Sequence, residues 1–174
     1  MYFEKFPKID YEVKGDGVNY KMTDITRRVR FFNSKILDSV SFDYYDVKSG
    51  QTPEMIANEI YDDPNLHWVV LIANNITDVY TQWPMSVQQF ENFVKDKYTN
   101  PAAIHHYEIF QTSGDTTLKI ELPNESATTI PNDAVAVSNY QYEESVQDAK
   151  RKIRLIRSQY IQQIEQEFER IITI

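Results

Sequence analysis

The stretch YYDVKSGQTPEMIANEIYDDPNLHWVVLIANNI, Tyr44–Ile76, decides the fold, because a strand, a glycine turn and two helices follow one another in it almost without linkers. Residues 40–48 are rich in valine, phenylalanine and tyrosine and lead to Gly50, which is typical of a strand and its turn. Thr52 is a good helix N-cap, and Pro53 suits the first helical position. The sequence therefore predicts a strand that leads directly into a helix.

The second helix of this stretch, predicted from Leu66 to about Asn74, is apolar on nearly every side. We expect Asp63 to cap it, with Pro64 at its first position. Asn74 and Asn75 tolerate the left-handed conformation that ends a helix. A helix without a polar face is buried on most sides. We therefore expect these core side chains to be buried together: Ile56, Trp68, Val69 and Ile72.

The chain before this stretch predicts an arm and a helix. Residues 1–22 hold a cluster of aromatic residues and a turn at Lys14–Gly17. They are either a terminal strand packed on the body or an arm that docks on a neighbouring chain. From Thr23, apolar residues recur at helical spacing as far as Ile36, which predicts a helix.

The chain after it predicts a further helix, a hairpin and a long helix. Ser86 caps a helix that runs to about Tyr98, and residues 106–111 pair with 116–122 in a hairpin. Residues 123–139 are expected to form a loop or short edge strands. Apolar residues recur every three or four positions over Gln141–Ile172, which predicts one helix about 45 Å long.

These elements predict an α+β fold with a strand–helix–helix core, an added helix, a β-hairpin region and a long C-terminal helix. The expected segments are 1–39 (arm and helix), 40–100 (core with the added helix), 101–139 (hairpin and loop) and 140–174 (long helix).

Composition excludes several classes of function. The formal net charge is −8 and the pI is near 4.9, which argues against nucleic acid and anionic membranes as partners. The chain has no cysteine, so disulfides, thiolate catalysis and cysteine-bound zinc are excluded. The N-terminus does not read as a signal peptide, and the longest apolar run, Trp68–Ala73, is too short to cross a bilayer.

No motif for catalysis, metal or cofactor binding stands out, so we expect no enzymatic activity, no metal site and no cofactor. His105 and His106 are adjacent, and on a strand they would point to opposite faces and could not share a metal. Five cations in Lys150–Arg157 favour a solvated, ion-paired helix face, with a nucleic-acid contact as the alternative.

Two apolar regions are candidates for binding a partner: the N-terminal aromatic residues and the stripe of the long helix. Because chain ends are usually polar and frayed, an apolar C-terminus indicates that something covers it. The alternative is that the helix folds back over the hairpin of residues 104–122. The candidate residues are Tyr2, Phe3, Phe6, Ile153, Ile156, Tyr160, Ile164 and Phe168.

The opening stretch resembles a LysM module over about 35 residues. The residues that carry the likeness are Gly50, Thr52, Ile56, Ala57, Tyr61, Trp68, Asn74 and Asn75. The sequence departs from that family in its Gly50–Gln51 turn, and no closing strand follows Asn75; we expect one from elsewhere, such as residues 104–122.

Nearly the whole chain resembles the LysM-containing wedge subunit of contractile-tailed phage baseplates. The likeness rests on KMTDITRR (21–28), the opening stretch, YTQWPMSVQQFENFVKDKY (80–98) and the C-terminal helix. It implies a structural virion protein of the phage tail, assembled in the bacterial host cytoplasm, with six copies in the ring. Its implied role is to clamp neighbouring wedge proteins together around the central hub.

An alternative function is a carbohydrate-binding module that recognises peptidoglycan or chitin-like N-acetylglucosamine polymers. Such a groove needs exposed aromatic and polar side chains, and the sequence offers Tyr80 and Asn75. Because this is little, we expect glycan binding to be absent or very weak.

Overall fold

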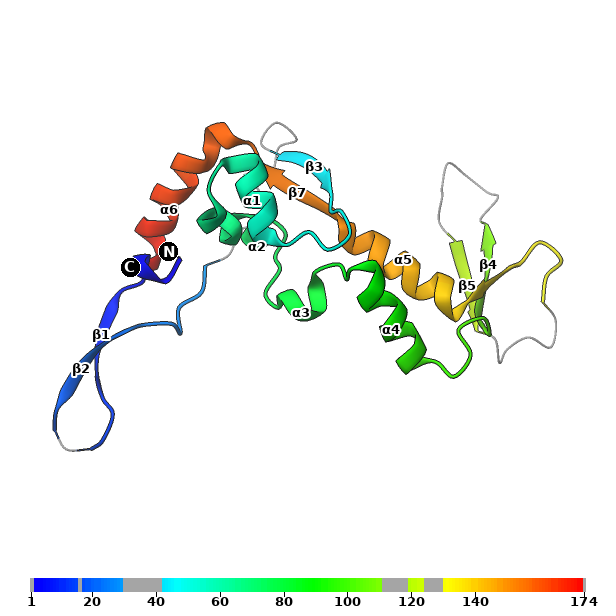
Figure 1. Ribbon diagram of the computed structural model, residues 1–174, viewed down its shortest axis with the longest axis horizontal. Helices are drawn as coiled ribbons and strands as arrows, with labels where there is room; N and C mark the ends of the chain where they lie inside the picture. Colours follow the sequence, from blue (N-terminus) through cyan, green and yellow to red (C-terminus); the bar gives the residue numbers. More distant parts are fainter. Residues whose placement is uncertain (1, 16, 30–41, 111–118, 124–129, 174) are drawn as a thin grey trace. The chain divides into compact units, whose positions relative to one another are not determined.

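The structure is a computed structural model that describes residues 2–15, 17–29, 42–110, 119–123 and 130–173 (Figure 1). The chain forms two compact units. Unit 1 consists of Met1–Trp83 and Lys152–Ile174, and unit 2 of Pro84–Arg151. Helices and small antiparallel sheets occur in both units, which confirms the α+β class.

The centre of unit 1 is a two-stranded antiparallel sheet with two helices inserted between its strands in sequence. Strand β3 (Phe42–Asp46) pairs with β7 (Lys152–Ile156), so that Tyr44 lies opposite Arg154. Between them in sequence come α1 (Pro53–Tyr61) and α2 (His67–Ala73). The strand that closes this sheet therefore comes from residues 152–156, and the expectation that it would come from 104–122 is wrong.

The helices of unit 1 begin where their capping residues lie. The Thr52 hydroxyl accepts a hydrogen bond from the Met55 amide at the start of α1. Asp63 caps the short 3₁₀ helix η2 (Pro64–Leu66), which leads into α2. One short helix was not expected: α3 (Val79–Gln82) begins at Asp78, whose carboxylate accepts from the Tyr80 amide.

The prediction of one long C-terminal helix over residues 141–172 is wrong. Its residues form α5 (Asn139–Arg151), β7, the 3₁₀ helix η4 (Ser158–Tyr160) and α6 (Ile161–Thr173). The physical reason is that β3 needs a neighbouring strand for its backbone hydrogen bonds. Residues 152–156, which are mostly buried and include β-branched isoleucines, provide that strand. Tertiary pairing overrides the helical spacing of the apolar residues.

The N-terminal region holds a 3₁₀ helix, η1 (Tyr2–Lys5), and a hairpin of β1 (Lys8–Glu12) and β2 (Asn19–Thr23). Gly15 and Gly17 in the connection have positive φ, as the predicted turn requires. The helix expected from Thr23 does not begin there, because Thr23 pairs with Lys8 in the hairpin. Residues 24–29 are not helical, and residues 30–36 of that prediction lie outside the described residues.

Unit 2 contains α4 (Val87–Lys97), α5 and a sheet in the order β5–β4–β6. The sheet strands are β4 (Ile104–Phe110), β5 (Lys119–Pro123) and β6 (Val135–Ser138), which confirms the predicted hairpin and an edge strand. Helix α4 confirms the helix expected after Ser86, which forms a capping box with Gln89.

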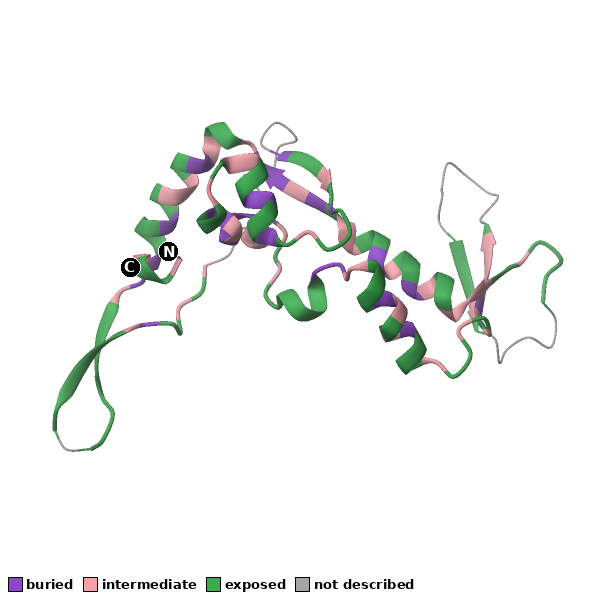
Figure 2. Ribbon diagram, in the orientation of Figure 1, coloured by how far each residue is buried: buried purple, intermediate pink, exposed green. Residues whose placement is uncertain are grey.

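The main hydrophobic core lies in unit 1, between the β3–β7 sheet, α1, α2 and α6 (Figure 2). The expected core residues Ile56, Trp68 and Val69 are buried, and the partly buried Ile72 packs against them. In the described part of the chain, none of the helices has the length and apolar character needed to span a bilayer.

Candidate assembly surfaces

The turn between β3 and α1 is fixed by backbone geometry and by a tryptophan. Gly50 has a φ of 76°, a left-handed conformation that suits glycine. The indole Nε1 of Trp83 donates to the carbonyl of Gln51 at 2.9 Å. The Gln51 side chain is itself engaged, because its amide donates to Glu59 and to the Tyr45 hydroxyl. The polar groups of this turn therefore hold the turn together.

Two side chains tie the helices to β7. The Tyr61 hydroxyl donates to the Ile156 carbonyl at 2.8 Å, and burial raises the pKa of this phenol to about 12. The Asn74 side chain both donates to the Arg154 carbonyl and accepts from the Arg154 amide, each at 2.8 Å. It pairs with β7 as a neighbouring strand would. Asn75 has a φ of 54°, the left-handed conformation expected at this helix end.

An aromatic cluster joins the N-terminus to α6. The Trp68 ring lies 4.5 Å, between centroids, from Phe168 and 5.7 Å from Tyr2. Phe6 packs on the same rings, 5.0 Å from Tyr2 and 6.2 Å from Phe168. Lys5 adds an ion pair with Glu165 at 2.9 Å. The first residues of the chain are thus part of the core of unit 1.

The residues of the predicted partner surface lie in different surroundings within unit 1. Four of the eight are buried in the chain's own core: Phe6, Ile153, Ile156 and Phe168. The apolar stripe of residues 153–168 is covered within unit 1, because 152–156 is a strand and α6 packs on the core. Tyr2, Tyr160 and Ile164 are partly buried against this core. Phe3 is 55% exposed and stays a predicted contact.

Among the motif residues, Gly50 lies in the turn, Thr52 caps α1 and Tyr61 binds β7. Asn74 and Asn75 lie at the end of α2. The remaining three, Ile56, Ala57 and Trp68, are buried. All eight therefore have structural roles.

A surface that sequence reasoning missed lies on the β1–β2 hairpin. Ile9 is paired with Met22 and Tyr11 with Tyr20, so these four side chains share one face. All four are exposed. The alternation of apolar and polar residues in IDYEV and VNYKM is the signal that could have revealed this face, because a period of two is typical of a strand with one apolar side. We call these four residues the hairpin face.

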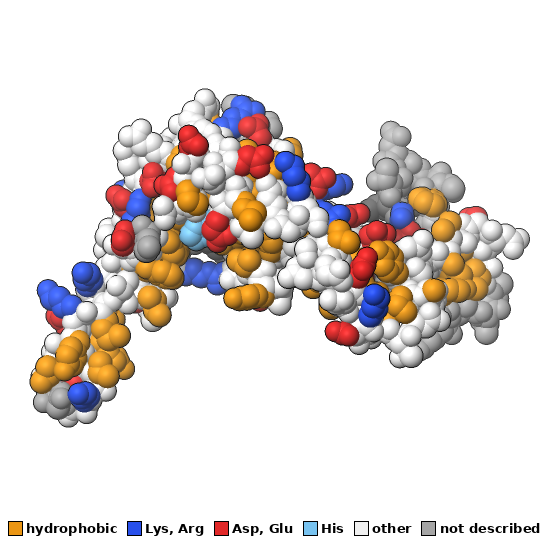
Figure 3. All heavy atoms as spheres, in the orientation of Figure 1, with side chains coloured by type: hydrophobic (Ala, Val, Ile, Leu, Met, Phe, Trp, Pro, Cys, Tyr) orange, Lys and Arg blue, Asp and Glu red, His pale blue; other side chains and the backbone are white. Residues whose placement is uncertain are grey.

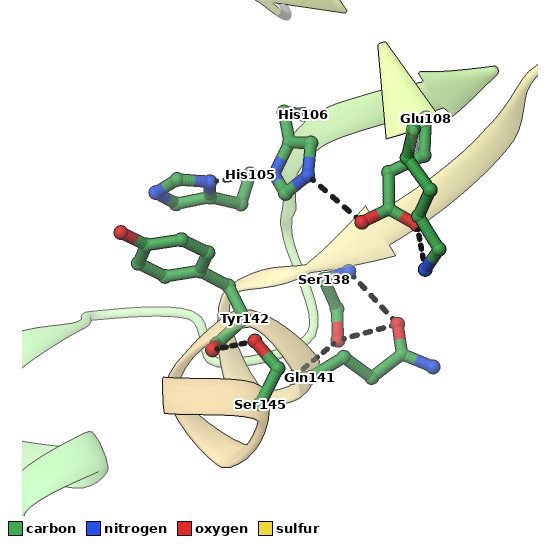
Figure 4. Close-up of polar contacts among 8 residues, drawn as sticks. His105, His106, Glu108, Ser138, Gln141, Tyr142 and Ser145 are labelled. Carbon is green, nitrogen blue, oxygen red and sulfur yellow. Dashed lines mark hydrogen bonds and ion pairs between the residues drawn. The ribbon is translucent and has the colours of Figure 1, made fainter. Parts of the chain in front are cut away.

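The histidine pair of β4 also differs from expectation. An irregularity in the β4–β6 pairing between Ile104 and His106 breaks the simple alternation of faces, and the two rings meet (Figure 4). The Nδ1 atoms of His105 and His106 are 2.9 Å apart, so one ring donates to the other. His105 stacks on Tyr142 of α5 with centroids 4.0 Å apart. The prediction that the two side chains point apart is therefore wrong.

The surroundings of this pair are those of a packed structural cluster. His106 Nε2 lies 3.6 Å from a carboxylate oxygen of Glu108, which also pairs with Lys119. Within the residues that the structure describes, no group of three or more His, Cys, Asp or Glu could hold a metal ion.

Comparison with known proteins found a family model and a curated relative that match this chain. The family model described as base plate wedge protein 53 matches residues 1–115. The baseplate wedge protein gp53 of Enterobacteria phage T4 is 33% identical over 103 residues, which cover 58% of this chain and 53% of that relative. The chain thus spans about half the length of this curated relative.

Proposed function

Because the chain belongs to the base plate wedge protein 53 family, we propose that it is a structural subunit of a contractile phage tail, which clamps neighbouring wedge proteins together around the central hub. The observation that carries this proposal is the family match over residues 1–115. That range contains the hairpin and most of the unit 1 core. We place the protein in the virion, at the tail baseplate, in six copies assembled in the bacterial host cytoplasm.

We further propose that β3, α1, α2 and β7 form a LysM-like core. Support comes from the order strand–helix–helix–strand, the antiparallel pairing of β3 with β7, and the structural roles of the eight motif residues. In this view, unit 2 is an insertion between the second helix and the closing strand.

The proposed role of this core is to hold subunits in place, without glycan binding and without catalysis. The side chains around its first turn bond to one another, as Gln51 does with Tyr45 and Glu59. In the segment that follows α2, the Tyr80 ring is 94% exposed. A single ring there gives a sugar chain little to stack on. Calorimetry with chitin oligomers should detect no binding, and a low-micromolar dissociation constant would favour the carbohydrate-binding alternative.

The clamp role is tested by removing the protein during phage assembly. Infection with phage that carry a stop codon early in this gene should yield wedges that do not close into a stable ring. Supply of the intact chain from a plasmid should restore the ring. Normal baseplates in the absence of the protein would contradict the proposal.

A further inference from the structure

The ring contact between His105 and His106 holds a single hydrogen. Their Nδ1 atoms lie 2.9 Å apart, so one of the two nitrogens donates a hydrogen and the other accepts it. A neutral imidazole has one N–H group and one lone pair, whereas a charged imidazolium has two N–H groups and no acceptor. The contact therefore requires that at least one of the two rings is neutral. If both rings were charged, two N–H groups would point at each other.

The surroundings of His106 decide which ring accepts. Its Nε2 is buried, has no hydrogen-bond partner among the described residues, and lies 3.6 Å from a carboxylate oxygen of Glu108. A hydrogen on this nitrogen is attracted by the carboxylate, whereas a lone pair there would be repelled by it. Neutral His106 therefore carries its hydrogen on Nε2 and accepts at Nδ1, and His105 is the donor.

A first added proton fits this arrangement, and a second does not. His105 is partly exposed, and its Nε2 lies on the side of the ring away from His106 (Figure 4). A proton added at that nitrogen leaves the Nδ1–H donor, and thus the ring contact, unchanged. The next proton has to bind the Nδ1 of His106, which is the acceptor of the contact. Its uptake removes the lone pair on which the contact depends.

Packing between β4 and α5 holds the two rings in contact. His106 is only 6% exposed. Tyr142 of α5 stacks on His105 with an angle of 8° between the ring planes, and its edge-on contact with His106 has 5.9 Å between centroids. A histidine ring that turned away from its neighbour would lose these contacts with Tyr142. Separation of the two rings therefore also loosens β4 from α5.

The groups around the pair offer little negative charge to a second proton. Glu108 is already paired with Lys119, and Glu143 is paired with Lys97 at 2.7 Å. Figure 3 shows acidic and basic side chains interspersed over α4 and α5. Strand β6 carries no titratable side chain. The charged and titratable groups on the described elements around the pair are Glu108 on β4, Lys119 and Glu121 on β5, Tyr142 and Glu143 on α5, and Lys97 and Tyr98 at the end of α4.

We propose that His105 and His106 form a proton-operated lock between β4 and α5 of unit 2. With no added proton, or with one, the rings stay in contact and the lock is closed. Uptake of the second proton separates the rings, and β4 comes away from α5. This inference goes beyond the proposed function and does not depend on it, because it concerns the response of one unit to acid.

The direction of the pH effect follows from the number of protons bound. Below the pH at which an ordinary histidine titrates, about 6.5, an open pair binds two protons and the closed pair binds one. The state that binds one proton more gains up to about tenfold in relative population for each pH unit lowered. The lock is therefore closed at pH 7 and opens increasingly below about pH 6. Glu143, whose pKa lies below 4.5, responds only at lower pH.

NMR of the full chain with isotope-labelled histidine tests the lock without any substitution. At pH 7 a scalar coupling between the two Nδ1 atoms should be observed through the shared hydrogen, with the hydrogen of neutral His106 on Nε2. At pH 5 this coupling should be lost. Absence of the coupling at pH 7, or a coupling that persists when both rings are protonated, would overturn the proposal.

A single substitution separates this pair from other acid-sensitive groups. In His106→Asn, the side-chain oxygen can accept from His105 Nδ1 but has no proton to take up, so the second protonation is removed. Between pH 6 and pH 5, the hydrogen-exchange protection of β4 and α5 amides should fall at least fivefold in the wild type and less than twofold in His106→Asn. Protection is corrected for the intrinsic exchange rate at each pH.

His67 provides the matched control. Its Nδ1 lies 3.1 Å from the Pro64 carbonyl and can donate to it in both charge states, so protonation does not break this contact. The variant His67→Asn should therefore keep the wild-type fall in the protection of β4 and α5. Equal falls in the wild type and in His106→Asn would overturn the lock, as would a fall that disappears in His67→Asn.

Discussion

At the scale of single residues, the unit 1 core depends on a few side chains that each satisfy several neighbours. Trp68 is 5% exposed and contacts rings from the N-terminus and from α6. Asn74 replaces the missing hydrogen-bond partner at the middle of β7. Tyr61 binds the end of the same strand. Loss of any of these side chains leaves either a cavity or unpaired polar groups.

Replacement of Trp68 by Ala should destabilise unit 1 by about 3–5 kcal/mol, because a large buried aromatic side chain is lost and leaves a cavity. Urea unfolding followed by far-ultraviolet circular dichroism measures this change. Tyr80→Ala is the matched control, since this almost fully exposed ring should cost at most about 0.5 kcal/mol. A Trp68→Ala variant as stable as the control would refute the buried aromatic cluster.

The buried Glu143 of α5 gives unit 2 a defined response to acid. Burial raises its pKa, but hydrogen bonds from Lys97 and Tyr98 and nearby positive charge outweigh burial, and the net pKa lies below the ordinary value of 4.5. A lowered folded-state pKa stabilises the fold fully above the unfolded-state pKa. That contribution is lost as the pH falls through the lowered value.

We therefore expect the protection of α4 and α5 amides from hydrogen exchange to fall between pH 5 and pH 3. In Glu143→Gln, which cannot lose a proton, the fall over this range should be smaller. Exchange measured by NMR and corrected for the intrinsic rate at each pH tests this. An unchanged pH profile in the variant would show that another group is responsible.

At the scale of elements, the pairing of β3 with β7 closes the core. Ile153, Leu155 and Ile156 are buried, and the Arg154 side chain lies over the Phe42 ring, 5.5 Å from its centroid. The two strands are separated by 105 residues from Asp46 to Lys152, although they lie side by side.

The cysteine-free chain allows a direct test of this register. Tyr44→Cys combined with Arg154→Cys places two thiols on opposite residues, where adjacent strands bring Cα atoms within about 4.5–5.5 Å. Mild oxidation should give a disulfide, visible as faster migration on a non-reducing gel. The control pair Tyr44→Cys with Lys152→Cys is two residues out of register and should link much less. Equal yields would contradict the β3–β7 pairing.

These elements also show how far sequence reasoning reaches. Local sequence signals are strong where the chain carries a helix-capping residue, as at Thr52–Pro53 and Ser86. Both helices begin there as predicted. At 152–156 the apolar residues fit helical and strand periods about equally well. The partner strand decides the outcome, and it lies more than 100 residues away. The hairpin face was missed for a related reason, because its aromatic residues were taken together without regard to their alternation.

At the scale of the whole molecule, the two units differ in how much apolar surface they bury. Nearly all buried apolar residues of the described chain belong to unit 1, and those in unit 2 are Pro84, Phe90 and Val94. Unit 2 depends more on polar contacts, such as Glu143 with Lys97 and Gln147 with the Met85 amide. Hydrophobic burial is the main stabilising contribution, so unit 2 has less of it to offset the entropy of folding.

We therefore expect unit 2 to open before unit 1. In hydrogen exchange at pH 7, amides of α4, β4 and α5 should be at least tenfold less protected than those of α1, α2 and β7. Low protection marks the segments that unfold locally. Uniform protection across both units would mean that they unfold as one, and would contradict this ranking.

The central claim, that the chain clamps baseplate wedges, is tested most directly by a cryo-electron microscopy map of the baseplate from the phage that encodes it. The account predicts density for unit 1 where neighbouring wedges meet, with one copy for each of the six wedges. A baseplate that lacks this chain, or that holds it only at a surface away from the wedge junctions, would contradict the claim.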